Sequence, residues 1–398
     1  MTKKSDAPAI RFKGFSDAWE QRKLGDIADI VGGGTPSTGN QSYWDGDIDW
    51  YAPAEIADQI YANSSQKKIT GLGYENSSAK MLPPGTVLFT SRAGIGKTAI
   101  LTRKGCTNQG FQSIVPHRGE LDSYFIFSRT EELKRYGELV GAGSTFVEVS
   151  GKQMAVMELM MPPTMREQQT IGGFFQQLDH LITLHQRKFE KLTNVKKSML
   201  EKMFPQNGSS YPEIRFKGFT DPWEQRKFEE IAVRSSVICS DDTLPRVEYE
   251  DIVSGTGRLN KDIYAKQSIK SGIAFHQGDV LYGKLRPYLQ NWLLPTFDGL
   301  AVGDFWVLQP QNADSSFLYR LIQSRQFDEV ANQSTGTKMP RADWKLVSKT
   351  VFSIPSNISE QAAIGTYFTA LDSLITLHQR ELEKLQNIKK SMLEKMFV

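Results

Sequence analysis

The chain has 398 residues, of which 39% are hydrophobic and 23% are charged, and this balance excludes wholesale disorder. Its length exceeds what one ordinary hydrophobic core organises, so we expect two or three domains. The formal net charge of +3 permits a nucleic-acid partner without requiring one. The two cysteines form no metal framework, and the sequence shows neither a signal peptide nor an apolar run long enough to cross a membrane, so we expect a cytoplasmic protein.

The chain opens with a segment that it later repeats. Residues 10–27 and residues 214–231 agree at 13 of 18 positions. In the first copy Asp17 lies where a short helix is predicted to begin, because an acidic side chain suits a helix N-terminus. The tryptophan that follows, Trp19 or Trp223, is a predicted packing anchor. Two copies of one opening segment indicate two halves of similar construction.

The segments that follow these copies differ in sequence but share a pattern of short β-branched and aromatic runs broken by Gly, Pro, Asn and Ser. This pattern is typical of mixed α/β modules. We place the first module in residues 1–163 and the second in residues 214–356, with a linker over residues 205–213. The sequence predicts helices over residues 124–137 and 315–333, and last strands over residues 157–161 and 351–354.

Residues 91–98 (SRAGIGKT) follow a strand-like run and resemble a phosphate-binding P-loop imperfectly. A P-loop needs glycine at its first position and a helix after its last. Here Ser91 stands first, and Gly105 soon ends the segment that follows. The second half has no such motif at the equivalent place, so an ATPase is kept only as a rival hypothesis.

The loops of both modules carry side chains suited to nucleic acid. Lysine and arginine neutralise phosphates, arginine also forks onto guanine, and side-chain amides read adenine. Glycine beside hydroxyl residues allows backbone to approach a phosphate closely. The alternative for each residue is an ordinary solvated surface position. The candidate DNA contacts are Ser91, Arg92, Lys97, Asn108, Gln109, Ser144 and Thr145 in the first module, and Lys284, Arg286, Tyr288, Asn291, Thr337, Lys338, Arg341 and Trp344 in the second.

Each module is followed by a predicted long helix, over residues 164–204 and 357–398. Between residues 171–204 and residues 364–397, 25 of 34 aligned positions are identical. Apolar residues recur at alternating spacings of three and four, which is the pattern of a coiled coil. Pairing within the chain about a pseudo-two-fold axis makes the helices antiparallel. The predicted interface for the helix pair or a partner comprises Phe175, Leu178, Ile182, His185, Phe189, Leu192, Phe368, Leu371, Ile375, His378, Leu382 and Leu385.

Thr164 and Glu167 have the spacing of a capping box at the start of the first long helix, and the second helix has a weaker version. His185 and His378 fall on the apolar seam without a second metal ligand in register, so we predict packed histidines and no metal site. The sequence shows no nucleophile–base pair and no methyltransferase motif. We therefore predict no catalytic residue in this chain.

Taken together, these features resemble the specificity subunit of type I restriction-modification enzymes. The resemblance rests on two divergent modules that are each followed by a near-identical helix, and it covers essentially the whole chain. Its local matches are LPPGTVLFTSRAGIG and TNQGF in the first half, and GDVLYGKLRPYLQNW, STGTKMPRADWK and LITLHQRELEKLQNIKKSMLEKMF in the second. It implies an α+β fold in which two mixed α/β target recognition domains are joined by an antiparallel coiled coil.

The resemblance also implies a function. Each recognition domain would read one half of an asymmetric bipartite site in double-stranded DNA, while the helices set the spacer and dock two adenine-methylating subunits. This chain would bind no cofactor, because S-adenosylmethionine, ATP and magnesium belong to partner subunits, which can include two motor-nuclease subunits. Two alternatives stay open: the specificity chain of a related fused cut-and-methylate enzyme, and a coiled-coil scaffold that reads no DNA.

Overall fold

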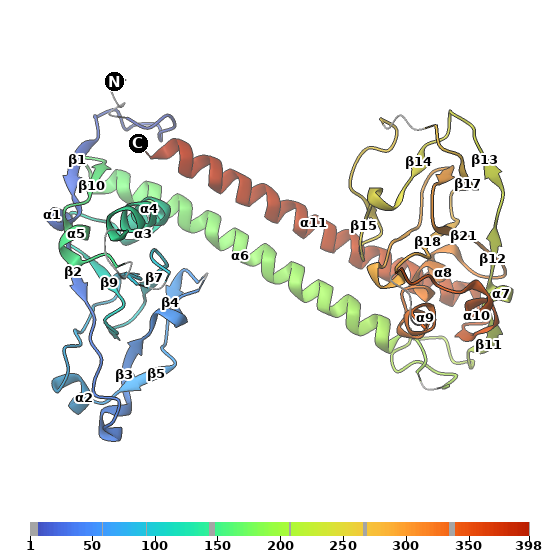
Figure 1. Ribbon diagram of the computed structural model, residues 1–398, viewed down its shortest axis with the longest axis horizontal. Coiled ribbons are helices and arrows are strands. Elements are labelled where there is room, and N and C mark those ends of the chain that lie inside the picture. The colour runs from blue at the N-terminus through green and yellow to red at the C-terminus, as the bar shows by residue number, and fades with distance from the viewer. Residues whose placement is uncertain are drawn as a thin grey trace. The chain divides into compact units, whose positions relative to one another are not determined.

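The computed structural model describes residues 7–57, 59–92, 94–142, 148–206, 208–265, 269–333 and 339–397. The chain divides into two compact units. Unit 1 contains Met1–Leu184 and Leu382–Val398, and unit 2 contains His185–Glu381. Each unit therefore combines one module with the beginning of its own long helix and the end of the other (Figure 1). In the described part of the chain, no helix is long and apolar enough to cross a membrane.

Unit 1 is built on a five-stranded sheet with the order β2-β9-β6-β7-β4. Adjacent strands of this sheet are antiparallel, except that β4 is parallel to β7. The strands are β2 (Ala28–Gly32), β9 (Gln112–Pro116), β6 (Val87–Phe89), β7 (Thr98–Leu101) and β4 (Tyr61–Ala62). A second sheet has the order β5-β3-β8 and comprises β5 (Lys67–Ile69), β3 (Trp44–Tyr51) and β8 (Cys106–Thr107).

Short helices and one strand pair complete the module of unit 1. β1 (Glu20–Lys23) pairs antiparallel with β10 (Glu158–Met161). The predicted helix over residues 124–137 is two helices, because Asp122 caps the first and the chain turns at Arg129. The short helices are α1 (Leu24–Ile27), α2 (Gly71–Glu75), α3 (Ser123–Ser128), α4 (Thr130–Gly141) and α5 (Gly151–Ala155), with 3-10 turns η1 (Gln41–Tyr43) and η2 (Pro53–Glu55).

Unit 2 repeats this plan with different details. The sheet β12-β21-β18-β19 is antiparallel and comprises β12 (Ala232–Ser235), β21 (Phe305–Pro310), β18 (Val280–Gly283) and β19 (Trp292–Leu293). The sheet β13-β17-β20-β14 comprises β13 (Ile238–Cys239), β17 (Gly272–Phe275), β20 (Gly299–Ala301) and β14 (Arg246–Val247). Two strand pairs are β15 (Ile252–Val253) with β16 (Arg258–Leu259), and β11 (Glu224–Lys227) with β22 (Val351–Ile354).

The predicted helix over residues 315–333 is also interrupted. Asp314 caps α8 (Ser315–Leu321), and the Ser324 hydroxyl then caps a new helix, α9 (Arg325–Ala331). The remaining short elements are α7 (Phe228–Ile231), α10 (Trp344–Lys349), η3 (Tyr249–Asp251) and η4 (Pro287–Leu289).

The predicted short helix at Asp17 is wrong. The chain is irregular there, and the next element is strand β1, which the distant strand β10 holds in an extended conformation. Trp19 is a packing anchor as predicted, since it is 3% exposed and its indole N–H donates to Glu167 at 3.2 Å. Trp223 repeats this role with Glu360, also at 3.2 Å.

The long helices are α6 (Met165–Lys202) and α11 (Ile358–Met396), and neither contains proline. Within each unit the two helices run antiparallel. In unit 1 Lys389 pairs with Asp179 at 2.6 Å, and in unit 2 Lys196 pairs with Asp372 at the same distance. All twelve residues of the predicted helix interface are buried or half-buried, which is the expectation for a coiled-coil seam.

Each core takes an aromatic side chain from the end of the other repeat's helix. In unit 1 the Phe397 ring stacks on Phe175 at 5.8 Å and lies 6.4 Å from Trp19. In unit 2 the Phe204 ring lies 6.0 Å from Trp223 and stacks on Phe317. This exchange gives the shared sequence SMLEKMF one packing role in both halves.

Candidate nucleic-acid interface

The loop that joins β6 to β7 is the turn of an antiparallel hairpin. Thr90 closes it: the Thr90 carbonyl accepts from Gly96 N–H, and the Thr90 hydroxyl accepts from Lys97 N–H, both at 3.0 Å. Gly96 has a φ of +93°, which glycine adopts freely. These N–H groups bond within the loop, and Thr98 begins a strand instead of a helix. The described residues of this loop therefore form no P-loop, and the ATPase hypothesis loses its motif.

Two cationic side chains of this hairpin reach the surface of unit 1. Lys97 is exposed, and Arg92 is about half exposed and pairs with Glu148 at 2.7 Å. The backbone N–H of Ser91 donates to the carbonyl of Gly110 at 2.8 Å, so the loop that carries Gln109 lies beside the hairpin. The structure thus brings three predicted contacts, Arg92, Lys97 and Gln109, into neighbouring loops.

Other predictions in unit 1 need correction. Ser91 is fully buried, so its hydroxyl cannot touch DNA in this conformation. The Asn108 side-chain oxygen accepts from Gly110 N–H at 2.7 Å and shapes its own turn, so that oxygen is already used. Ser144 and Thr145 lie outside the described residues.

In unit 2 one carboxylate organises the predicted contacts. Asp304 lies 3.5 Å from the Lys284 ammonium and 3.1 Å from the Arg341 guanidinium. The backbone joins the same two segments, since Ala342 N–H donates to the Lys284 carbonyl at 2.8 Å and Arg286 N–H donates to the Pro340 carbonyl at 2.7 Å. Two cations around one carboxylate leave a net positive surface, which suits phosphate.

Tyr249 is a supporting residue that sequence reasoning missed. Its hydroxyl accepts from Leu285 N–H at 2.8 Å and lies 3.1 Å from the carbonyls of Leu285 and Asp304. Burial raises the pKa of Tyr249, so the hydroxyl stays protonated. The adjoining Arg286 has a φ of +49°, an uncommon value for a residue other than glycine. Tyr249 therefore fixes the loop that presents Lys284 and Arg286.

The remaining predictions in unit 2 divide in two. Tyr288 is 57% exposed, as a contact residue requires, whereas Asn291 is buried and its side-chain oxygen accepts from Ser254 at 3.0 Å. Trp344 is a packing residue: its ring lies 5.2 Å from Trp306 and 5.0 Å from the Arg234 guanidinium. Both Asn291 and Trp344 are corrected to supporting roles. Thr337 and Lys338 lie outside the described residues.

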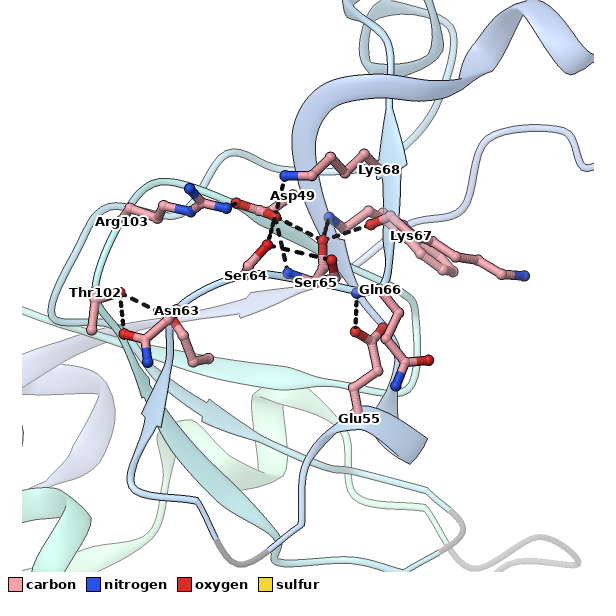
Figure 2. A network of polar contacts seen from close by, with 12 residues as sticks. Asp49, Glu55, Asn63, Ser64, Ser65, Gln66, Lys67, Lys68, Thr102 and Arg103 are labelled. Atoms are coloured by element: carbon pink, nitrogen blue, oxygen red, sulfur yellow. Dashed lines mark hydrogen bonds and ion pairs between the residues drawn. The ribbon is translucent and has the colours of Figure 1, made fainter.

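A second basic region of unit 1 was not predicted. Figure 2 shows Lys68 and Arg103 converging on the buried carboxylate of Asp49, at 2.9 Å and 2.6 Å. Burial alone would raise the pKa of Asp49, but hydrogen bonds from Lys68 and Ser65 lower it overall. The carboxylate thus stays ionised and fixes both cations, which are 33% and 50% exposed. Their sequence separation hid this cluster, because only the fold joins β5 to the segment after β7.

Both long helices expose leucine pairs at equivalent positions. Leu181 and Leu184 of α6 are 40% and 38% exposed, and Leu374 and Leu377 of α11 are 44% and 51% exposed. The two pairs are related by the internal repeat, one pair in each unit. Apolar side chains exposed at equivalent positions of both helices form a candidate surface for a protein partner.

Comparison with known proteins agrees with this architecture. Residues 16–194 and 222–387 match the family described as the type I restriction modification DNA specificity domain. The specificity subunit of the type I restriction enzyme MjaIX from Methanocaldococcus jannaschii is 25% identical over 404 residues, covering 95% of this chain and 92% of that protein. The MjaVIII specificity subunit of the same organism is 20% identical over 401 residues, covering 94% and 91%.

Among solved structures, the S subunit of a type I restriction-modification system from M. genitalium is similar in fold. The TM-score is 0.64 and the sequence identity is 13%, and the match covers 98% of this chain and 99% of that chain. The similarity therefore extends over both units and both long helices.

Proposed function

The chain belongs to the family of type I restriction-modification DNA specificity subunits, and from that premise we propose how its two halves work. Each module reads one half of an asymmetric bipartite site in double-stranded DNA. This proposal is supported by a contrast between the two units, which share one framework but differ in their loops. The framework of Arg11, Trp19 and Glu167 returns unchanged as Arg215, Trp223 and Glu360, while the loops that present cations differ between the units.

The differing loops predict two unlike half-sites. Unit 1 presents a glycine hairpin with Arg92 and Lys97, and unit 2 presents Lys284, Arg286 and Tyr288 around a left-handed turn. Different side chains in different backbone geometries favour different base edges, because each edge pattern needs donors and acceptors at particular positions. The DNA target is therefore non-palindromic.

The long helices set the spacer between the half-sites and dock two adenine-methylating subunits. A helix of 38 residues is about 57 Å long at 1.5 Å per residue, which exceeds one turn of DNA, roughly 34 Å. The duplicated leucine pairs, Leu181 with Leu184 and Leu374 with Leu377, supply two equivalent surfaces. Two equal surfaces favour two copies of one partner over a single partner.

Catalysis and cofactors belong to the partners in this proposal. The described residues contain no group of three or more His, Cys, Asp or Glu side chains that could hold a metal ion. S-adenosylmethionine is assigned to the methylating subunits, and ATP with magnesium is assigned to two motor-nuclease subunits where these join. The specificity chain of a fused cut-and-methylate enzyme would present the same surfaces. We assign the complex to the cytoplasm, where bacterial and archaeal DNA lies.

A salt titration of DNA binding tests DNA reading against the scaffold hypothesis. The complex of this chain with its methylating subunit should bind duplex DNA with an affinity that falls steeply as salt rises. Replacing Lys97 by Ala should weaken binding to all sequences equally and reduce the slope of log affinity against log salt by about 1. Lys23→Ala, at an exposed position on β1, is the control and should leave the slope unchanged. An affinity that does not depend on salt would favour the scaffold.

A further inference from the structure

Unit 2 contains a large cleft beside the long helices. Its volume is about 1030 Å³, and all of its lining residues belong to unit 2. The end of α6, the first half of α11, the turn between β15 and β16, strand β19 and helix α8 form its walls. Among the lining side chains are Phe189, Lys197, Trp292, Arg320, Thr376 and Arg380.

Three buried donor atoms in this wall have no acceptor among the described residues. They are the indole N–H of Trp292 and the Nε–H of Arg320, whose residues are only 5% and 2% exposed, and the side-chain amide of the half-buried Gln323. Buried donors in native proteins nearly always have an acceptor, and leaving one unpaired is costly. These atoms are shielded from solvent by the packed wall, so they show a polar wall and do not themselves reach a ligand in the cleft.

The charges of the side chains that line the cleft favour an anionic ligand. Six cationic side chains and three carboxylates line the cleft. One carboxylate, Asp372, is already held by Lys196 at 2.6 Å and by Arg320 at 2.7 Å. Aromatic and aliphatic side chains, including Phe189 and Trp292, supply the remaining wall. The combination fits a molecule that has an anionic group on an aromatic body.

The internal repeat shows that this wall is particular to unit 2. Asp179 of unit 1 is equivalent to Asp372 of unit 2. Asp179 accepts a hydrogen bond from the hydroxyl of Tyr124 at 2.9 Å, whereas Asp372 accepts one from the guanidinium of Arg320. The repeat partner of Thr369 is Gln176, which donates to the hydroxyl of Tyr61 at 2.6 Å. Aromatic side chains therefore occupy the corresponding place in unit 1. A site common to two methylating subunits would be present in both units, so we assign the cleft to another ligand.

We propose that this cleft of unit 2 is a binding site for a free nucleoside phosphate. The phosphate would meet Lys197, Arg258 and Arg380 at the rim, and the base would lie against Trp292 and Phe189. The volume is at the upper end of the range, roughly 300–1,000 Å³, typical of small-molecule sites. The proposal does not depend on DNA reading, because it concerns the isolated chain and a different set of residues.

The test is calorimetric titration of the full chain with adenosine 5′-monophosphate, uridine 5′-monophosphate and inorganic phosphate. Thr376→Trp should fill the cleft from α11 and weaken nucleotide binding at least tenfold. Thr183→Trp is the matched control at the equivalent position of α6, and it should bind like the original chain. Arg380→Gln, with Arg187→Gln as its repeat control, tests the rim without touching a buried group. Circular dichroism and melting without ligand should show that each variant folds.

Three outcomes would overturn the proposal. The first is no heat of binding with either nucleotide at millimolar concentration. The second is equal nucleotide affinity in Thr376→Trp and Thr183→Trp. The third is inorganic phosphate binding as tightly as the nucleotides, which would leave no role for the aromatic wall. A short DNA duplex is titrated in parallel, and if only the duplex loses affinity in Thr376→Trp, the cleft contacts the DNA backbone and not a free nucleotide.

Discussion

Glu167 joins the opening segment of the chain to the start of α6. It accepts two hydrogen bonds from the Arg11 guanidinium, at 2.6 Å and 2.8 Å, and a third from the Trp19 indole. The hydrogen bond to Glu167 raises the pKa of Arg11 despite partial burial. Glu167 therefore serves the tertiary fold, and only Thr164, whose hydroxyl accepts from Glu167 N–H at 3.3 Å, fulfils the predicted capping role.

Replacing Glu167 by Gln should destabilise unit 1 by about 2 kcal/mol, because the half-buried Arg11 would lose its charged partner and only part of that loss is offset by solvent. Chemical unfolding of the full chain measures this loss. Glu360→Gln should cause a similar loss in unit 2, where Arg215 and Trp223 repeat the contacts. Glu329→Gln, in the exposed pair with Arg325, should change the free energy of unfolding by less than about 1 kcal/mol. Equal effects at Glu167 and Glu329 would contradict this account.

At the scale of elements, α6 and α11 meet in unit 2 through two histidines. The Nδ1 atoms of His185 and His378 lie 3.1 Å apart. One ring must donate and the other accept, so the contact requires that the two rings are not both protonated. Burial lowers the pKa of His378, and the positive charges of His185 and Lys188 lower it further.

The stability of the helix pair should therefore fall in mild acid. Near pH 6.5 the unfolded chain binds more protons than the folded chain, because the folded-state pKa of His378 is lowered. The stability that depends on neutral His378 is fully present above about pH 6.5. It is lost as the pH falls from there through the folded-state pKa of His378. Melting curves from pH 7.5 to 5.5 measure it. His378→Gln should flatten this dependence, while His180→Gln, at an exposed position of α6, should not. An unchanged slope in His378→Gln would refute the role of the pair.

Much of the fold followed from the sequence, because its signals are local or repeated. The heptad spacing predicted the buried seam of α6 and α11, and the strand over residues 351–354 was confirmed as β22. The helix at Asp17 was wrong because pairing between β1 and β10 spans more than 130 residues. Burial of Ser91 and the bridge that Asp304 makes from Lys284 to Arg341 depend on tertiary neighbours. The contacts of the exposed loop residues with DNA stay a prediction.

At the scale of the whole molecule, each compact unit takes elements from both repeats, so neither core is complete within one half of the sequence. Phe397 completes the core of unit 1, and Phe204 completes that of unit 2. The compact units therefore differ from the consecutive segments placed over residues 1–163 and 214–356. The helices that link the units are also the elements proposed to set the spacer.

Lengthening both helices should lengthen the DNA spacer. One heptad inserted after Leu184 in α6 and one after Glu381 in α11 keep the apolar seam in register. Seven residues add about 10 Å of helix, which corresponds to roughly three base pairs at 3.4 Å each. The methylated motif should gain about three unspecified positions while both half-sites stay the same. An insertion in α6 alone should abolish methylation, and an unchanged spacer in the double insertion would refute the ruler.

The central claim is that this chain alone decides which adenines its complex methylates. The most direct measurement is a genome-wide map of methylated adenines in cells that carry this chain with its methylating subunit, beside cells that lack only this chain. We expect one motif that depends on the chain, with two unlike halves separated by a fixed unspecified spacer. A motif that persists without the chain, or a palindromic or uninterrupted motif, would contradict the account.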